Sequence, residues 1–190
     1  MTEFWLVRHG QTDWNLAGRW QGQTASAPGL NETGHAQALE TLKLLSDKRF
    51  AAIYSSDLLR SRQTAEIIAA ALGLDLVLEP RLREIDLGEW EGLLSTEIEA
   101  CYPNELAERV RNPLHARAPR GESLSEMAKR VIAAMNALAR KYPDSLVLIV
   151  SHGVTLALII CHAEKIPLEE VYEHLPGNAQ LHCVHWDLEK

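Results

Sequence analysis

Arginine and histidine side chains follow an apolar run at the start of the sequence. Residues 4–7 are typical of a buried strand, and Arg8, His9 and Gly10 come directly after it. Neighbouring side chains of a strand point to opposite faces, so Arg8 and His9 can serve one pocket only where the strand ends. A guanidinium group beside an imidazole suits a negatively charged ligand. These residues therefore predict an anion-binding pocket at the end of the first strand.

Two other apolar runs, 51–54 and 146–150, also end in polar residues. The residues that follow them are Ser55, Ser56, Asp57, Arg60, Ser151, His152 and Gly153. In open α/β sheets the carboxyl ends of parallel strands meet at one edge, and ligands bind there. We therefore expect all three polar segments to converge on one site.

Helical patterns lie between these strands. Apolar spacing predicts helices over 36–45, 58–72, 127–138 and 154–163, and further strands over 74–78 and 180–187, the last at an edge. The expected helix caps are Asn31 or Thr33, then Asp57, and Ser123 in a capping box, with Gly73 ending the second helix. Alternating strands and helices predict one α/β domain over 1–190, with a largely parallel central sheet and helices on both faces.

The middle of the chain is irregular. Glycines and prolines punctuate residues 81–121, and two short helical patches lie near 95–101 and 104–111. The segment is too short for a core of its own. We expect it to form a small cap-like insertion over the active site.

The composition of the sequence disfavours several classes of function. The 190 residues carry a formal net charge of −7, which disfavours a nucleic-acid partner. No apolar run approaches the roughly 18 residues of a membrane span, and no signal peptide precedes the first strand. Three scattered cysteines argue for a reducing compartment and against a thiolate metal site. We therefore expect a cytoplasmic protein without metal or cofactor; its oligomeric state is left open, with a homodimer as one option.

The motifs also carry a resemblance. Residues 6–15, with Arg8-His9-Gly10 followed by Thr12 and Asn15, resemble the signature of the histidine phosphatase superfamily, the phosphoglycerate-mutase-like fold. Four more segments, 55–65, 82–92, 119–123 and 150–153, resemble its other motifs in the same order. The small size resembles that of bacterial phosphatases such as α-ribazole phosphatase and the broad-specificity phosphatases.

The resemblance implies a role for each motif residue. His9 is the expected nucleophile and Glu84 the expected proton donor, while Arg8, Arg60 and His152 are expected to hold the phosphoryl group. The expected substrate contacts are Thr12, Asn15, Gln21, Gly22 and Gly153. Neutral imidazole attacks phosphorus without prior deprotonation, and guanidinium forks match phosphate oxygens.

Competing residues stay open for some roles. Glu89 and Glu91 compete with Glu84 for the acid, and Arg62 competes with Arg60 for the phosphate. Trp14, Trp20 and Trp90 are candidates for the substrate entrance. A strand at 180–187 would place His182 and His185 on opposite faces, which disfavours a metal pair.

The expected activity is hydrolysis of a small phosphorylated metabolite through a phosphohistidine. The alternatives are a phosphoglycerate mutase and an inactive module that only binds a phosphorylated ligand. The chain lacks the longer middle insertion of the glycolytic mutases, which favours the phosphatase. A weaker hypothesis gives Arg117 or Arg120 a second anionic group of the substrate; a solvated surface is the favoured interpretation of both.

Overall fold

The computed structural model describes residues 1–188 and has a five-stranded sheet at its centre. The strands are β1 (Thr2–Arg8), β2 (Ala52–Ser55), β3 (Leu76–Leu78), β4 (Leu146–Ser151) and β5 (Leu181–Trp186), in the spatial order β3-β2-β4-β1-β5. All neighbours are parallel except β5, which pairs antiparallel with β1. The predicted largely parallel sheet with a late edge strand is confirmed, although β3 is shorter than expected.

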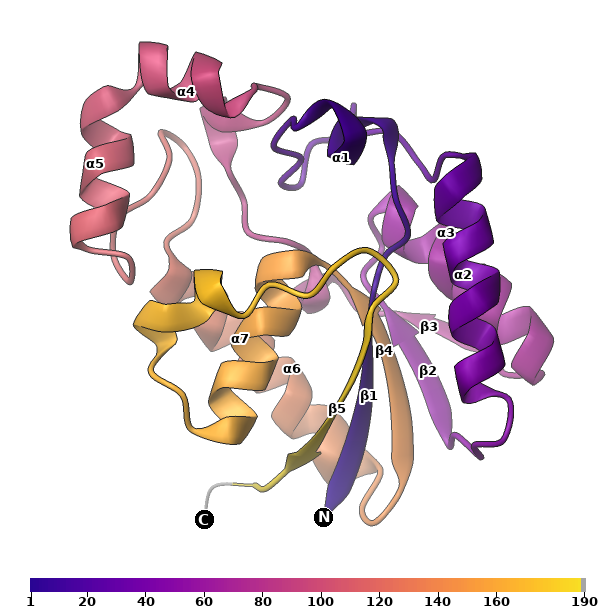
Figure 1. Ribbon diagram of the computed structural model, residues 1–190. Helices are drawn as coiled ribbons and strands as arrows, with labels where there is room; N and C mark the ends of the chain where they lie inside the picture. Colours follow the sequence, from indigo (N-terminus) through magenta and orange to yellow (C-terminus); the bar gives the residue numbers. More distant parts are fainter. Residues whose placement is uncertain (189–190) are drawn as a thin grey trace.

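Long helices cover both faces of the sheet (Figure 1). On one side lie α2 (Glu32–Leu45) and α3 (Leu59–Leu72), and on the other α6 (Leu124–Lys141) and α7 (Gly153–Glu164). Asn31 caps α2, Ser123 forms the capping box of α6, and Gly73 ends α3, as predicted. Asp57 was the wrong cap for α3, because Leu58 precedes that helix and the Asp57 carboxylate is paired with the Arg83 guanidinium.

The alternation of side chains along the strands builds two hydrophobic cores. Phe4, Leu6 and Ile149 belong to the core under α6 and α7, whereas Val7 and Val150 belong to the core under α2 and α3. These strand residues are almost completely buried, and burial of that kind stabilises by about 1.5–3 kcal/mol for each large aliphatic or aromatic side chain. The central strands are thereby fixed, and so are the polar residues at their ends.

The remaining elements gather near the carboxyl ends of the parallel strands. Helices α1 (Asp13–Ala17), α4 (Ser95–Cys101) and α5 (Pro103–Arg111) lie at that end, opposite the N-terminus (Figure 1). Three short 3₁₀ helices, η1 (Pro80–Leu82), η2 (Gly88–Trp90) and η3 (Leu168–Glu173), complete the chain. Within residues 1–188, no helix is both long enough and apolar enough to cross a membrane.

Candidate active site

A cavity of about 680 Å³ opens at the carboxyl ends of β1 and β4. Its lining joins the strand ends to the insertion and to the segment that follows α7. The lining residues include Arg8, His9, Asn15, Trp20, Gln21, Gly22, Arg60, Glu84, Leu106, Arg109, Val110, Gly153, Val154, Tyr172 and Leu175. Residues from three separate strand ends therefore meet around one cavity.

His9 is nearly completely buried and directly follows β1. Its Nδ1 lies 2.7 Å from the carbonyl oxygen of Gly10, which only accepts hydrogen bonds, so Nδ1 carries the proton. Its Nε2 accepts a hydrogen bond from Arg60 Nε at 3.2 Å. The imidazole therefore presents an unprotonated Nε2 beside a guanidinium.

Arg60 lies in the first turn of α3 and is 2% exposed. Its Nη2 donates to the carbonyl of Gly22 at 2.9 Å. Burial lowers the pKa of Arg60 to about 10, with a smaller lowering from the charge of Arg8, so the group stays charged at neutral pH. Gly22 has a φ of +50°, and an added Cβ there would collide with the Glu91 carboxylate. A larger residue at position 22 would therefore displace the Glu91 carboxylate and strain the backbone whose carbonyl Arg60 binds.

Arg8 and His152 each hold a buried nitrogen with no partner among the described residues. Arg8 Nη1 donates to the Pro176 carbonyl at 2.6 Å, but its Nε has no acceptor. His152 Nε2 lies 2.8 Å from Ser56 Oγ, and its Nδ1 is unpaired. Buried polar atoms are normally hydrogen-bonded, so these two nitrogens suit the oxygens of a bound anion. The centres of the His9 and His152 rings are 5.3 Å apart, so His152 lies next to the imidazole of His9.

Glu84 reaches the amino end of α7 from the segment between η1 and η2. Its carboxylate accepts hydrogen bonds from Val154 N at 3.1 Å and from Thr155 N at 3.2 Å. The amide of Ile85 and the hydroxyl of Thr155 add two more, at 3.0 and 3.3 Å. These donors fix the Glu84 carboxylate on the wall of the cavity that His9 also lines.

Asn15 and Thr12 form the capping box of α1. Thr12 is fully buried and does not line the cavity, so this geometry does not support a contact between Thr12 and the substrate. Asn15 Oδ1 accepts from Thr12 and from Asn178 Nδ2 at 3.3 Å. Asn178 also donates to the His9 carbonyl at 3.0 Å, and nothing in the sequence around it indicates this role. Asn15 is thereby turned with its oxygen toward the protein, which leaves its amide hydrogens for the cavity.

Two further predicted contacts line the cavity. Gln21 is buried, and its Oε1 has no partner within residues 1–188. Gly153 begins α7, and an added Cβ there would lie 3.4 Å from the Arg8 guanidinium carbon. The cavity lining therefore includes every predicted site residue except Thr12 and His152. His152 is fully buried, and its ring centre lies 5.3 Å from that of His9.

The competing residues lie elsewhere. Arg62 points to the helix surface near Glu66, Glu89 lies 3.4 Å from Arg120, and Glu91 accepts the amide of Gln23. None of Arg62, Glu89 and Glu91 lines the cavity. Arg117 and Arg120 do not line the cavity either, which favours the interpretation of both as solvated surface residues. Both side chains are exposed, and Arg117 is paired with Glu126.

Comparison with known proteins agrees with this geometry. A family model described as histidine phosphatase superfamily (branch 1) matches residues 4–190. The chain belongs to this superfamily. The structure describes this matched region as far as residue 188.

Relatives of this chain carry two kinds of names. A probable phosphoglycerate mutase GpmB of Erwinia tasmaniensis is 43% identical over 171 residues, covering 88% of this chain and 77% of the relative. The Bacillus stearothermophilus YhfR structure is 31% identical with a TM-score of 0.88, covering 98% and 92%. The α-ribazole phosphatase of Shigella flexneri is 26% identical with a TM-score of 0.87, covering 97% and 91%. The family and fold are therefore shown, while the names divide between mutase and phosphatase.

The outer part of the cavity is largely apolar. Trp20 stands edge-on against the buried Trp90, with ring centres 5.7 Å apart. The Arg109 guanidinium lies over Trp20, Trp90 and Tyr172 and donates to the Tyr172 hydroxyl at 2.6 Å. Leu106, Val110 and Leu175 line the same side. The insertion, the loop after α1 and the segment that follows α7 together form a wall of aromatic and aliphatic side chains.

We expect the stability of this protein to fall at mildly acidic pH. Burial lowers the pKa of both His9 and His152 well below the usual value, and the charges of Arg60 and Arg8 lower them further. The unfolded chain binds protons at a pKa near 6.5, so below that pH it binds more protons than the folded chain, and stability falls as pH drops. Each histidine contributes at most about 1.4 kcal/mol of this loss at pH 5.5.

Denaturant unfolding at pH 7.5 and 5.5 measures the effect. His152→Asn should lose less stability between these pH values than the wild type does. Inorganic phosphate should also reduce the wild-type loss, since a bound anion favours protonated imidazole. An identical loss in wild type and variant would contradict the assignment to His152.

Proposed function

We propose that this histidine phosphatase hydrolyses a phosphorylated metabolite through a phosphohistidine on His9. The observation that carries the proposal is the unprotonated Nε2 of His9 on a cavity shared with Arg8, Arg60 and Glu84. Fixed positive charge and positioning are what phosphoryl transfer requires of a protein.

The reaction proceeds in two balanced steps. His9 Nε2 attacks phosphorus, the N–P bond forms and the P–O bond to the leaving group breaks, while Glu84 donates a proton to the departing alkoxide. Water then attacks the phosphohistidine and gives a proton to Glu84, and phosphate is released with His9 restored. Arg8 Nε, Arg60 and His152 Nδ1 hold the phosphoryl oxygens during both steps.

The size of the cavity favours a substrate larger than phosphoglycerate. A volume of about 680 Å³ lies within the range typical of sites for drug-sized ligands and is large for a three-carbon acid. The outer wall offers mainly apolar groups together with the carboxylates of Glu169 and Glu173. Arg109 and Arg19 already donate to Tyr172 and to the Gly92 carbonyl. We therefore infer a substrate whose leaving group is larger and less polar than glycerate.

A phosphoglycerate mutase remains the second candidate, because relatives about 40% identical carry that name. Phosphorus NMR of the protein with 3-phosphoglycerate, and with an aryl phosphate whose leaving group is larger, separates the three functions. A phosphatase releases inorganic phosphate, a mutase forms the 2-phospho isomer, and an inactive binding module does neither. A panel of alkyl, aryl and sugar phosphates then ranks the leaving groups. Rapid isomer formation with little phosphate release would overturn the proposal.

We expect Arg109→Ala to weaken binding of substrates with large leaving groups. The guanidinium stacks on three aromatic rings and ties α5 to η3 through Tyr172, and such contacts contribute about 0.5–1 kcal/mol each. KM should rise about fivefold to tenfold for an aryl phosphate and little for a small alkyl phosphate.

Arg111→Ala is the matched control for this prediction. Arg111 lies on the same helix and is 71% exposed beside Glu108. Equal increases in KM for both substrates in the Arg109 variant would show that the substitution displaces helix α5 and does not act on the leaving group. No change for either would remove Arg109 from the binding wall.

A further inference from the structure

The segment that carries Glu84 has no regular secondary structure. Residues 83–87 lie between η1 and η2 and make no strand pairs. Their carbonyls therefore need donors from elsewhere, because an unpaired polar backbone group is costly when buried. The position of the carboxylate depends on what supplies those donors.

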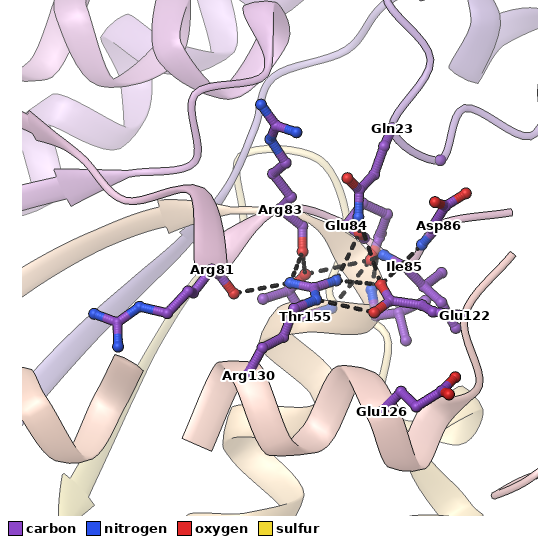
Figure 2. A network of polar contacts seen from close by, with 12 residues as sticks. Gln23, Arg81, Arg83, Glu84, Ile85, Asp86, Glu122, Glu126, Arg130 and Thr155 are labelled. Carbon is purple, nitrogen blue, oxygen red and sulfur yellow. Dashed lines mark hydrogen bonds and ion pairs between the residues drawn. The ribbon is translucent and has the colours of Figure 1, made fainter. Parts of the chain in front are cut away.

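Arg130 of α6 supplies donors to two of these carbonyls and to the carbonyl of Arg81 in η1. Its Nη1 donates to the carbonyls of Arg81 and Arg83, both at 2.8 Å, and its Nη2 donates to the carbonyl of Glu84 at 2.9 Å. Figure 2 shows the guanidinium pointing from α6 into this turn of the backbone. The planar fork of arginine spans three carbonyls, whereas a lysine ammonium is a point charge with three donors.

Glu122 completes the arrangement from the other side. It accepts from Arg130 Nε at 3.0 Å and from Arg130 Nη2. Its Oε1 also accepts the amide of Asp86 at 2.9 Å, and Gln23 Nε2 donates to the Glu84 carbonyl at 2.9 Å. The Arg130 and Glu122 side chains are only 21% and 17% exposed, so the pair is better shielded from water than a surface ion pair.

We propose that Arg130, held by Glu122, is a positioning residue for the proton donor. It fixes the backbone at residues 81–84, so that the Glu84 carboxylate meets the amides of Val154 and Thr155 on the cavity wall. Arg130 itself does not line the cavity. A displacement of about 1 Å at a catalytic group can cost on the order of 100-fold in rate. This inference rests on the proposed role of Glu84. It also gives a role to Glu122 in the motif at 119–123, for which the sequence alone predicts no chemistry.

The test compares leaving groups in single-turnover measurements of the first step. An alkyl phosphate needs a proton to leave, whereas p-nitrophenolate leaves without one. Arg130→Met and Arg130→Lys should slow transfer from the alkyl ester about 10-fold to 100-fold and transfer from p-nitrophenyl phosphate less than about threefold. Inhibition by inorganic phosphate should stay close to wild type, because the phosphate contacts are separate.

Two further variants keep the result interpretable. Arg140→Met is the matched control, since Arg140 is exposed on the same helix. Glu122→Gln keeps the fold contacts of its amide oxygen but loses the charge, and it should give the same leaving-group preference as Arg130→Lys. A purely structural role would instead slow both substrates alike and weaken phosphate inhibition, which would overturn the proposal.

The double variant with Glu84→Gln separates this inference from the proposed function. If Arg130 acts through Glu84, then adding Arg130→Met to Glu84→Gln should not slow the alkyl ester further. Additive losses would contradict the positioning role. If Glu84→Gln alone shows no leaving-group preference, the proposed role of Glu84 fails. A preference in Glu84→Gln that is absent from both Arg130 variants removes only the positioning role.

Discussion

Replacement of His9 by alanine is expected to lower the turnover number by on the order of 10⁴-fold or more, because the reaction loses its nucleophile. In the wild type, quenching a reaction with labelled substrate should leave acid-labile, base-stable label on residue 9. The label is expected on Nε2 of His9, because this nitrogen is unprotonated and the ring proton is on Nδ1. Rapid-quench mass spectrometry locates the label.

The exposed histidine of α2 gives the matched control. His35→Ala removes an imidazole that is exposed near the start of α2 and does not line the cavity, and it should leave both label and turnover unchanged. His9→Asn guards against a folding artefact, since the variant can be checked for binding of inorganic phosphate. Turnover that persists in a folded His9 variant would refute the phosphohistidine mechanism.

Replacement of Glu84 by glutamine should produce the second large effect, and it should depend on the leaving group. Glutamine keeps the size of the side chain and most of its hydrogen bonds to the start of α7, but it has no acidic proton. Transfer from an alkyl phosphate should slow about 10²–10⁴-fold, the usual contribution of a positioned acid. Transfer from p-nitrophenyl phosphate should change far less. Single-turnover measurement isolates this step from dephosphorylation.

Glu91→Gln and Glu89→Gln are the comparison variants. Burial raises the pKa of Glu91, which makes it the more serious competitor as an acid, but its carboxylate accepts the amides of Gln23 and Leu87. Both comparison variants should slow the two substrates to a similar, small extent. If the leaving-group preference follows Glu91 instead, the acid has been misassigned.

Much of the site could be predicted from the sequence because strand ends are easy to recognise. An apolar run that stops at Arg8-His9-Gly10 or at Ser151-His152-Gly153 fixes both the strand and the edge on which its polar residues lie. Parallel pairing then brings those edges together, as the register Arg8 with Ser151 confirms. The order of the motifs added Arg60 and Glu84, which lie on a helix and an irregular segment.

Other contacts could not be predicted, because they depend on tertiary packing alone. Asn178 reaches the site from the loop before β5, and neither periodicity nor a motif marks it. Thr12 carries the right functional group, but its hydroxyl caps a helix of five residues that the apolar pattern does not reveal. Within the insertion, arginine side chains repeat with no pattern that separates Arg109, inside the cavity, from the exposed Arg117 and Arg120.

The central position of β4 in the sheet has a consequence for how the protein folds during its synthesis on the ribosome. Val150 of β4 pairs with Val7 on one side and with Ser55 on the other, so β1 and β2 share no direct pairing. Until residues 146–151 emerge, the nascent chain carries two apolar strands with open edges and no partner between them. Long-range pairing of this kind closes late and slowly, and open edges invite association with other chains. Nascent chains that stall before β4 are therefore the form of this protein most in need of a chaperone.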